Sequence, residues 1–147
     1  MHTVFSHIIQ KRFSRMNEDV ATDALAYVLE SSDAARRGMT KLIRGITPDL
    51  PSLRFQAQQV EGAIRPDLWG FADNEARVFI ENKFWAGLTD NQPTSCLQQL
   101  AAHRQPTLLL VVAPAARERT LWRELLRRLD ADGIPVTERE AAPGVGQ

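Results

Sequence analysis

Three residues whose side chains could form one site, the carboxylates Asp67 and Glu81 and the ammonium Lys83, stand in two neighbouring apolar stretches of the chain. Each stretch has the length and composition of a β-strand, and the polar segment between them is centred on Asn74. If a hairpin closes there, Asp67 lies opposite Glu81, and strand alternation returns Lys83 to the face of Glu81. Because facing carboxylates repel unless a cation lies between them, the pattern predicts a divalent metal site.

A cross-strand salt bridge is the simpler interpretation of the same residues. Two acids and one ammonium, flanked by the aromatic rings of Trp69 and Phe79, are poorly matched for a plain ion pair. The metal site is therefore our preferred hypothesis, with the salt bridge as its alternative.

Hydrophobic periodicity predicts the elements that must position these side chains. The uninterrupted apolar run over residues 107–113 is typical of a strand buried on both faces. Both sides of the hairpin are also apolar, which indicates that helices cover both faces of the sheet. The expected fold is α/β, with a central mixed β-sheet flanked by helices and the order ααβββαβαβ. The predicted elements are a helix beginning near residue 17, a helix over 34–44, strands over 53–60, 64–71 and 77–83, a helix from the cap candidates 89–91 to about 103, a strand over 107–113, a helix over 117–129 and a strand over 134–137.

Composition narrows the class of protein. The chain has 147 residues, 18 of them basic and 18 acidic, so its net charge of zero argues against a generally basic nucleic-acid coat but leaves room for a local basic surface. One cysteine excludes an internal disulfide framework and fits a reducing, cytoplasmic location. We find no apolar run long enough to span a membrane. We expect an N-terminal arm (1–16), one domain (17–138) and a flexible tail (139–147), compatible with a piece of a longer multidomain protein.

These residues resemble the PD-(D/E)xK nuclease superfamily, whose members have the restriction-endonuclease-like fold. Pro66-Asp67 is similar to the PD element, and Glu81-Asn82-Lys83 is similar to the (D/E)xK element. The likeness covers roughly residues 17–113, in the family order of a helix, three strands, a helix and a strand. It implies an endonuclease-type hydrolase that cleaves phosphodiester bonds with the help of Mg²⁺ or Mn²⁺.

The resemblance also implies a set of metal ligands. Asp67 and Glu81 would bind the ion directly, and the backbone carbonyl of Asn82 would be the third ligand. Glu18, near the start of the first helix, is similar to an acid that many members place beside the metal. Compensation of the positive helix N-terminus is an equally good explanation for Glu18.

Two further roles follow from the likeness. Lys83 would orient the attacking water or stabilise charge in the transition state. Gln92 is similar to the first residue of a Gln-x-x-x-Tyr motif and could position a phosphate or a water, although it could also cap its helix. Cys96 stands at the Tyr position, so no phenol is present there. Trp85 follows the second strand and could stack on a base or pack at the rim of the core.

Basic residues suggest where a nucleic acid would bind. Four of them cluster in the second predicted helix: Arg36, Arg37, Lys41 and Arg44. We expect DNA rather than RNA as the substrate, in bacterial defence or DNA processing, and a homodimer is compatible with cleavage of both strands. A non-catalytic interaction module on the same fold and an RNA nuclease domain are the open alternatives.

Overall fold

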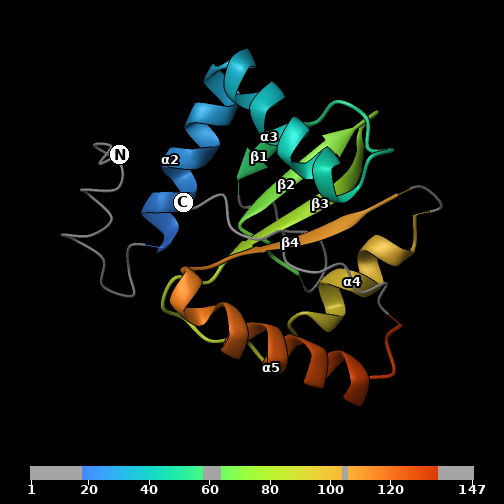
Figure 1. The fold of residues 1–147 in the computed structure, drawn as a ribbon. Helices are drawn as coiled ribbons and strands as arrows, with labels where there is room; N and C mark the ends of the chain where they lie inside the picture. Colours follow the sequence, from blue (N-terminus) through green and yellow to red (C-terminus); the bar gives the residue numbers. More distant parts are fainter. Residues whose placement is uncertain (1–17, 58–63, 104–105, 136–147) are drawn as a thin grey trace.

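The computed structural model describes residues 18–57, 64–103 and 106–135. The predicted arm and tail, and the last residues of the predicted strand over 53–60, lie outside these ranges. An initial helical pair is followed by three consecutive strands, a helix, a fourth strand and a final helix (Figure 1). They are α2 (Glu18–Ser31), α3 (Asp33–Ile46), β1 (Arg54–Ala57), β2 (Leu68–Ala72), β3 (Glu75–Asn82), α4 (Thr94–Ala101), β4 (Leu108–Val112), the 3₁₀ helix η2 (Ala115–Arg117) and α5 (Glu118–Ala131).

The four strands form one mixed sheet in the order β1-β2-β3-β4. β2 runs antiparallel to β1 and to β3, whereas β3 and β4 are parallel. A parallel pair needs a crossover connection, and here α4 provides it. The prediction of an α/β fold with a mixed sheet is therefore confirmed.

Helices cover both faces of the sheet, with α2 and α3 on one side and α4 and α5 on the other (Figure 1). The first layer packs Leu29 of α2 and Ile43 of α3 against Leu68, Val78 and Ile80 of the sheet. The second layer packs two residues of α4 against two aromatic rings of the sheet: Cys96, Leu100, Trp69 and Phe79. Successive strand residues thus alternate between two cores, as the apolar composition of both hairpin faces predicts.

The hairpin has the predicted register near the candidate site. Leu68 pairs with Ile80 and Trp69 pairs with Phe79, so the next position along places Asp67 opposite Glu81. The turn is tighter than the predicted five residues, because Asp73 and Asn74 both adopt positive φ, 51° and 64°. Two consecutive residues with positive φ give the right-handed twist that closes a short hairpin, and Asn and Asp tolerate it well. A register shift between Gly70 and Phe71 absorbs the difference.

The structure corrects two boundaries that concern the site. β2 begins at Leu68, so Asp67 lies immediately before the strand and not within it. α4 begins at Thr94, so the predicted caps at 89–91 and Gln92 belong to the preceding turn. A proline at position 93 has no N–H to donate, which favours the first turn of a helix over its interior.

One prediction about the later strands is wrong in part, and another is tested only in part. The strand predicted over 107–113 is present as β4, but it is half-buried along its length and not buried on both faces, because it is an edge strand of the described sheet. Its side chains contact both layers, but its outer backbone edge pairs with no other strand described. The last predicted strand, 134–137, does not begin as a strand at Ile134 and Pro135, and its other residues lie outside the described ranges. Proline at the second position removes a ladder hydrogen bond.

Candidate active site

Glu81, near the end of β3, is the centre of the candidate site. Its carboxylate points to the α4 side of the sheet and is buried. The Lys83 Nζ and the Gln92 Nε2 both donate to Glu81 Oε1, each at 2.6 Å. The other oxygen, Oε2, is buried and accepts no hydrogen bond. The sequence-predicted pair of Glu81 and Lys83 is therefore in direct contact, and one carboxylate oxygen is left for another partner.

Asp67 lies beside the peptide bond that follows Glu81. Its Oδ2 accepts a hydrogen bond of 2.7 Å from the backbone N–H of Asn82. The Asn82 nitrogen is bonded to the carbonyl carbon of Glu81, so Asp67 lies against the backbone that joins Glu81 to Asn82, as the register predicts. The side chain of Asp67 is half-buried, which leaves part of the carboxylate near solvent.

The side chain of Asn82 ties the site to α2. Its Nδ2 donates to Thr22 Oγ1 at 2.7 Å, and both residues are buried. Asn82 therefore points to the face of the sheet opposite to that of Glu81, as strand alternation requires. Glu18 is the first residue of α2, one helical turn before Thr22, and its side chain lies outside what the structure describes. The predicted metal role of Glu18 stays a prediction.

The described residues contain two of the predicted metal-binding carboxylates, Asp67 and Glu81. Within residues 18–57, 64–103 and 106–135, no group of three or more His, Cys, Asp or Glu side chains could hold a metal ion. The pair nevertheless suits a hard divalent ion, because such ions take carboxylate and carbonyl oxygens and keep several waters. The buried, unpartnered Glu81 Oε2 is the observation that makes them fit, since a cation would satisfy it.

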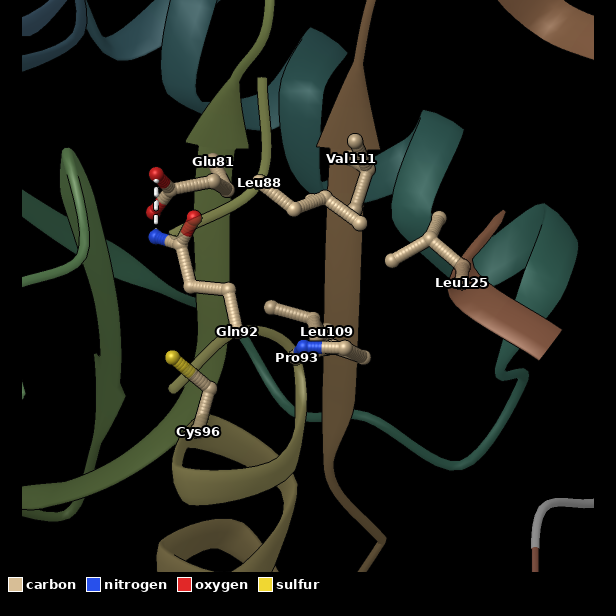
Figure 2. Close-up of a pocket in the computed structure, with 8 residues that line it drawn as sticks. All are labelled: Glu81, Leu88, Gln92, Pro93, Cys96, Leu109, Val111 and Leu125. Carbon is tan, nitrogen blue, oxygen red and sulfur yellow. Dashed lines mark hydrogen bonds between the residues drawn. The ribbon is translucent and has the colours of Figure 1, made fainter. Parts of the chain in front are cut away.

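Gln92 is oriented by the turn in which it lies. Its backbone N–H donates to the carbonyl of Thr89 at 3.0 Å, and its side-chain Oε1 accepts from the Thr89 N–H at 3.3 Å. This orientation leaves the Nε2 to donate to Glu81, as Figure 2 shows. The alternative that Gln92 caps α4 finds no support, because the N-cap position is Pro93 and receives no side-chain hydrogen bond.

Cys96 lies on α4 beside Gln92 and Glu81, in the position where the Tyr of the motif would be (Figure 2). Burial, together with the negative charge of Glu81, raises the pKa of the Cys96 thiol to about 11, although Lys83 opposes the shift. The thiol is therefore protonated at neutral pH and acts as a small apolar side chain.

A small pocket opens between Glu81 and α5. Its cavity volume of about 10 Å³ is at the lower limit of what one water molecule needs. Apart from the acid and the amide, its lining is largely apolar, with side chains from β4, α4 and α5 (Figure 2). The lining residues are Glu81, Leu88, Gln92, Pro93, Cys96, Leu109, Val111 and Leu125.

Two arginines that the sequence did not single out hold the loop between Lys83 and Gln92. Arg117, just before α5, donates from Nη1 to the carbonyl of Lys83 at 2.6 Å and from Nη2 to that of Ala86 at 3.0 Å. Arg128, in the last turn of α5, donates to the Gln92 carbonyl at 2.9 Å. Its guanidinium also donates to the carbonyls of Leu88 and Thr89. No local sequence signal marks these contacts, which join residues more than thirty positions apart.

The predicted nucleic-acid-binding cluster lies on α3, in the layer opposite to Gln92. Arg36 forms an ion pair with Asp33 and donates to the Leu29 carbonyl at 2.9 Å, so it fastens α3 to α2. Arg44 donates to the Leu50 carbonyl at 2.6 Å. The remaining members, Arg37 and Lys41, are exposed.

In the part of the chain that the structure describes, no helix is long and apolar enough to cross a membrane. Comparison of the chain with protein-family models, with curated proteins and with solved structures finds no match. The interpretation of the site therefore depends on its own geometry and on the resemblance of its motif.

Proposed function

We propose that the protein is a metal-dependent nuclease with a restriction-endonuclease-like fold, which hydrolyses phosphodiester bonds and acts on DNA. The arrangement of the sheet supports this proposal, because three antiparallel strands are followed by a parallel fourth strand with helices on both faces. Asp67 immediately precedes β2, and Glu81, Asn82 and Lys83 stand at the end of β3. The motif residues thus gather at one end of the central strand pair.

The unpartnered Oε2 of Glu81 is the single observation that carries the proposal. A buried carboxylate oxygen without a donor costs about 1–3 kcal/mol or more, because the group gives up its water and gains nothing in exchange. Lys83 and Gln92 could have shared the two oxygens, yet both donate to Oε1. A plain salt bridge does not explain this asymmetry, whereas a cation held at Oε2 does.

The residues that would hold the ion are Asp67, Glu81 and the carbonyl of Asn82, with Glu18 as a further candidate. When bound, Mg²⁺ or Mn²⁺ supplies a Lewis acid for the phosphoryl oxygen and a water of lowered pKa. The hydrogen bond from the Asn82 N–H to Asp67 Oδ2 fixes the first carboxylate, and the two donors on Oε1 fix the second. Both ligands are therefore oriented before an ion arrives.

Lys83 and Gln92 have roles that follow from their donors. An ammonium has three N–H donors, and the bond to Glu81 uses one of them. The others can stabilise negative charge that develops on a phosphoryl oxygen or orient the attacking water. Gln92 acts as a positioning residue, because its amide spans Thr89 and Glu81 and keeps the carboxylate in one orientation.

Cleavage assays test the proposal. The protein is incubated with plasmid DNA and with RNA, in Mg²⁺ or Mn²⁺ and in chelator. Asp67→Asn is the sharpest variant, because the amide oxygen can still accept from Asn82 while the charge needed for the ion is lost. We expect metal-dependent cleavage of DNA that Asp67→Asn and Lys83→Ala abolish. Thr120→Val, at an exposed position of α5, is the control that should cut normally.

The other outcomes are equally informative. Cleavage of RNA alone would mean that the substrate is RNA and not DNA. Failure to cut any nucleic acid, with binding unchanged in Lys83→Ala, would refute the proposal in favour of an interaction module. Circular dichroism of each variant is needed, because removal of one partner of the buried Lys83–Glu81 pair can cost about 3–5 kcal/mol of folding stability.

A further inference from the structure

The loop after β3 exposes a tryptophan beside the candidate site. Trp85 lies two residues after Lys83, and 59% of its surface is exposed. The other tryptophans differ, because Trp69 is buried at 1% exposure and Trp122 lies on α5 at 39%. A single exposed apolar side chain is common on protein surfaces, so exposure alone assigns no role. The position of Trp85 beside the site and the hydrogen bonds that hold its backbone are the features that indicate a role.

Arg117 fixes the backbone on both sides of this indole. Its guanidinium donates to the carbonyl of Lys83 at 2.6 Å and to that of Ala86 at 3.0 Å, so Trp85 lies between the two contacts. A planar guanidinium that bridges two carbonyls restrains the segment between them. A restrained aromatic residue loses little conformational entropy when a ligand binds. The indole is thus presented to solvent on an ordered loop.

Trp85 is close along the chain to the candidate catalytic groups. Two residues span at most about 7 Å, so the Trp85 backbone lies within that distance of Lys83, whose ammonium contacts Glu81. A base that neighbours a phosphate bound at Glu81 and Lys83 would therefore lie close to this segment of the chain.

We propose that Trp85 is a base-stacking residue and that the substrate presents an unpaired base there, in a single strand or a frayed end. This inference rests on the proposed nuclease function. A paired base inside a duplex is already stacked on its neighbours, so its face is available only after it leaves the stack. Stacking on an aromatic ring also provides affinity that a chain with 18 basic and 18 acidic residues does not obtain from net charge.

The test measures binding and cleavage separately. Fluorescence anisotropy follows a labelled single-stranded oligonucleotide and its blunt duplex, with chelator present to prevent turnover, and the same DNAs are then cut in Mg²⁺. We expect Trp85→Ala to weaken single-strand binding about 5- to 100-fold, with a smaller effect on the duplex. Trp85→Phe retains a stacking ring and should restore most of the affinity. Trp122→Ala, on the exposed part of α5, should bind like the wild type.

Wild-type affinity in Trp85→Ala, or an equal loss in Trp122→Ala, would overturn the inference. So would a change of oligomeric state in Trp85→Ala with unaltered oligonucleotide affinity, because the indole would then belong to a protein interface. The two proposals fail separately. Metal-dependent cleavage with no effect of Trp85→Ala contradicts stacking alone, whereas Trp85-dependent binding of single strands without cleavage contradicts hydrolysis alone.

Discussion

Replacement of Thr22 by Val is expected to destabilise the protein through one lost hydrogen bond. Thr22 is fully buried, and its hydroxyl accepts from Asn82 Nδ2 at 2.7 Å. Valine has nearly the same shape, so the substitution removes the acceptor without opening a cavity and leaves the buried Asn82 amide without its partner. Such a loss costs about 1–3 kcal/mol. For a domain of this size it corresponds to a decrease in melting temperature of roughly 2–12 °C.

Thermal and urea unfolding of three variants measure this effect. Asn82→Leu removes the amide, and the double variant Thr22→Val/Asn82→Leu removes both partners. Since no donor is left unsatisfied in the double variant, its loss should be smaller than the sum of the two single losses, with a coupling energy of about 0.5–3 kcal/mol. Thr120→Val is the exposed control and should change stability by less than about 0.5 kcal/mol. Strict additivity, or a Thr22→Val variant as stable as the wild type, would refute the contact between α2 and β3.

Three further predictions concern α4 and α5. Arg128→Ala should lower the cleavage rate while single-strand affinity changes little, because the guanidinium holds the turn that positions Gln92. Equal losses of cleavage rate and of single-strand affinity would contradict this role. Cys96 should resist alkylation in the native protein at pH 8, where a pKa of about 11 leaves about one thiol in a thousand ionised, and mass spectrometry should find fast modification only after denaturation. Hydrogen bonds from Arg127 and Arg128 lower the pKa of Glu124 to about 2 from 4.5. The stability that its carboxylate contributes is therefore complete above pH 4.5 and is lost as the pH falls toward 2. The difference in urea midpoint between wild type and Glu124→Gln should shrink over that interval and stay constant from about pH 5 to 7.

The register of the hairpin could be predicted because it depends on local features. Two apolar stretches of similar length around one polar turn allow few pairings, and the side-chain period of two then fixes which residues share a face. The pairings Leu68–Ile80 and Trp69–Phe79 confirm that reasoning as far as Leu68, the residue that follows Asp67. The turn has two residues, Asp73 and Asn74, and not the predicted five, because a register shift after Gly70, which hydrophobic patterning does not detect, lets the pairing continue to Ala72 and Glu75.

The polar contacts that support the site could not be predicted in this way. Thr22 and Asn82 are sixty residues apart, and Arg117 and Lys83 are thirty-four apart. Periodicity indicates which side of a helix is apolar, but it does not indicate which polar side chain meets which backbone carbonyl once the layers pack. Nothing in the local sequence sets Arg117 and Arg128 apart from the other arginines of this region, yet these two hold the loop beside the site.

Binding of a divalent ion by Asp67 and Glu81 is the central claim, and calorimetric titration with Mn²⁺ measures it without requiring a substrate. We expect saturable binding to the wild type, loss of that binding in Asp67→Asn, and unchanged binding in Thr120→Val. Binding of Mn²⁺ by Asp67→Asn with wild-type affinity, or no saturable binding by a folded wild-type protein, would contradict the account. In that case the Lys83–Glu81 contact would be a buried salt bridge and nothing more.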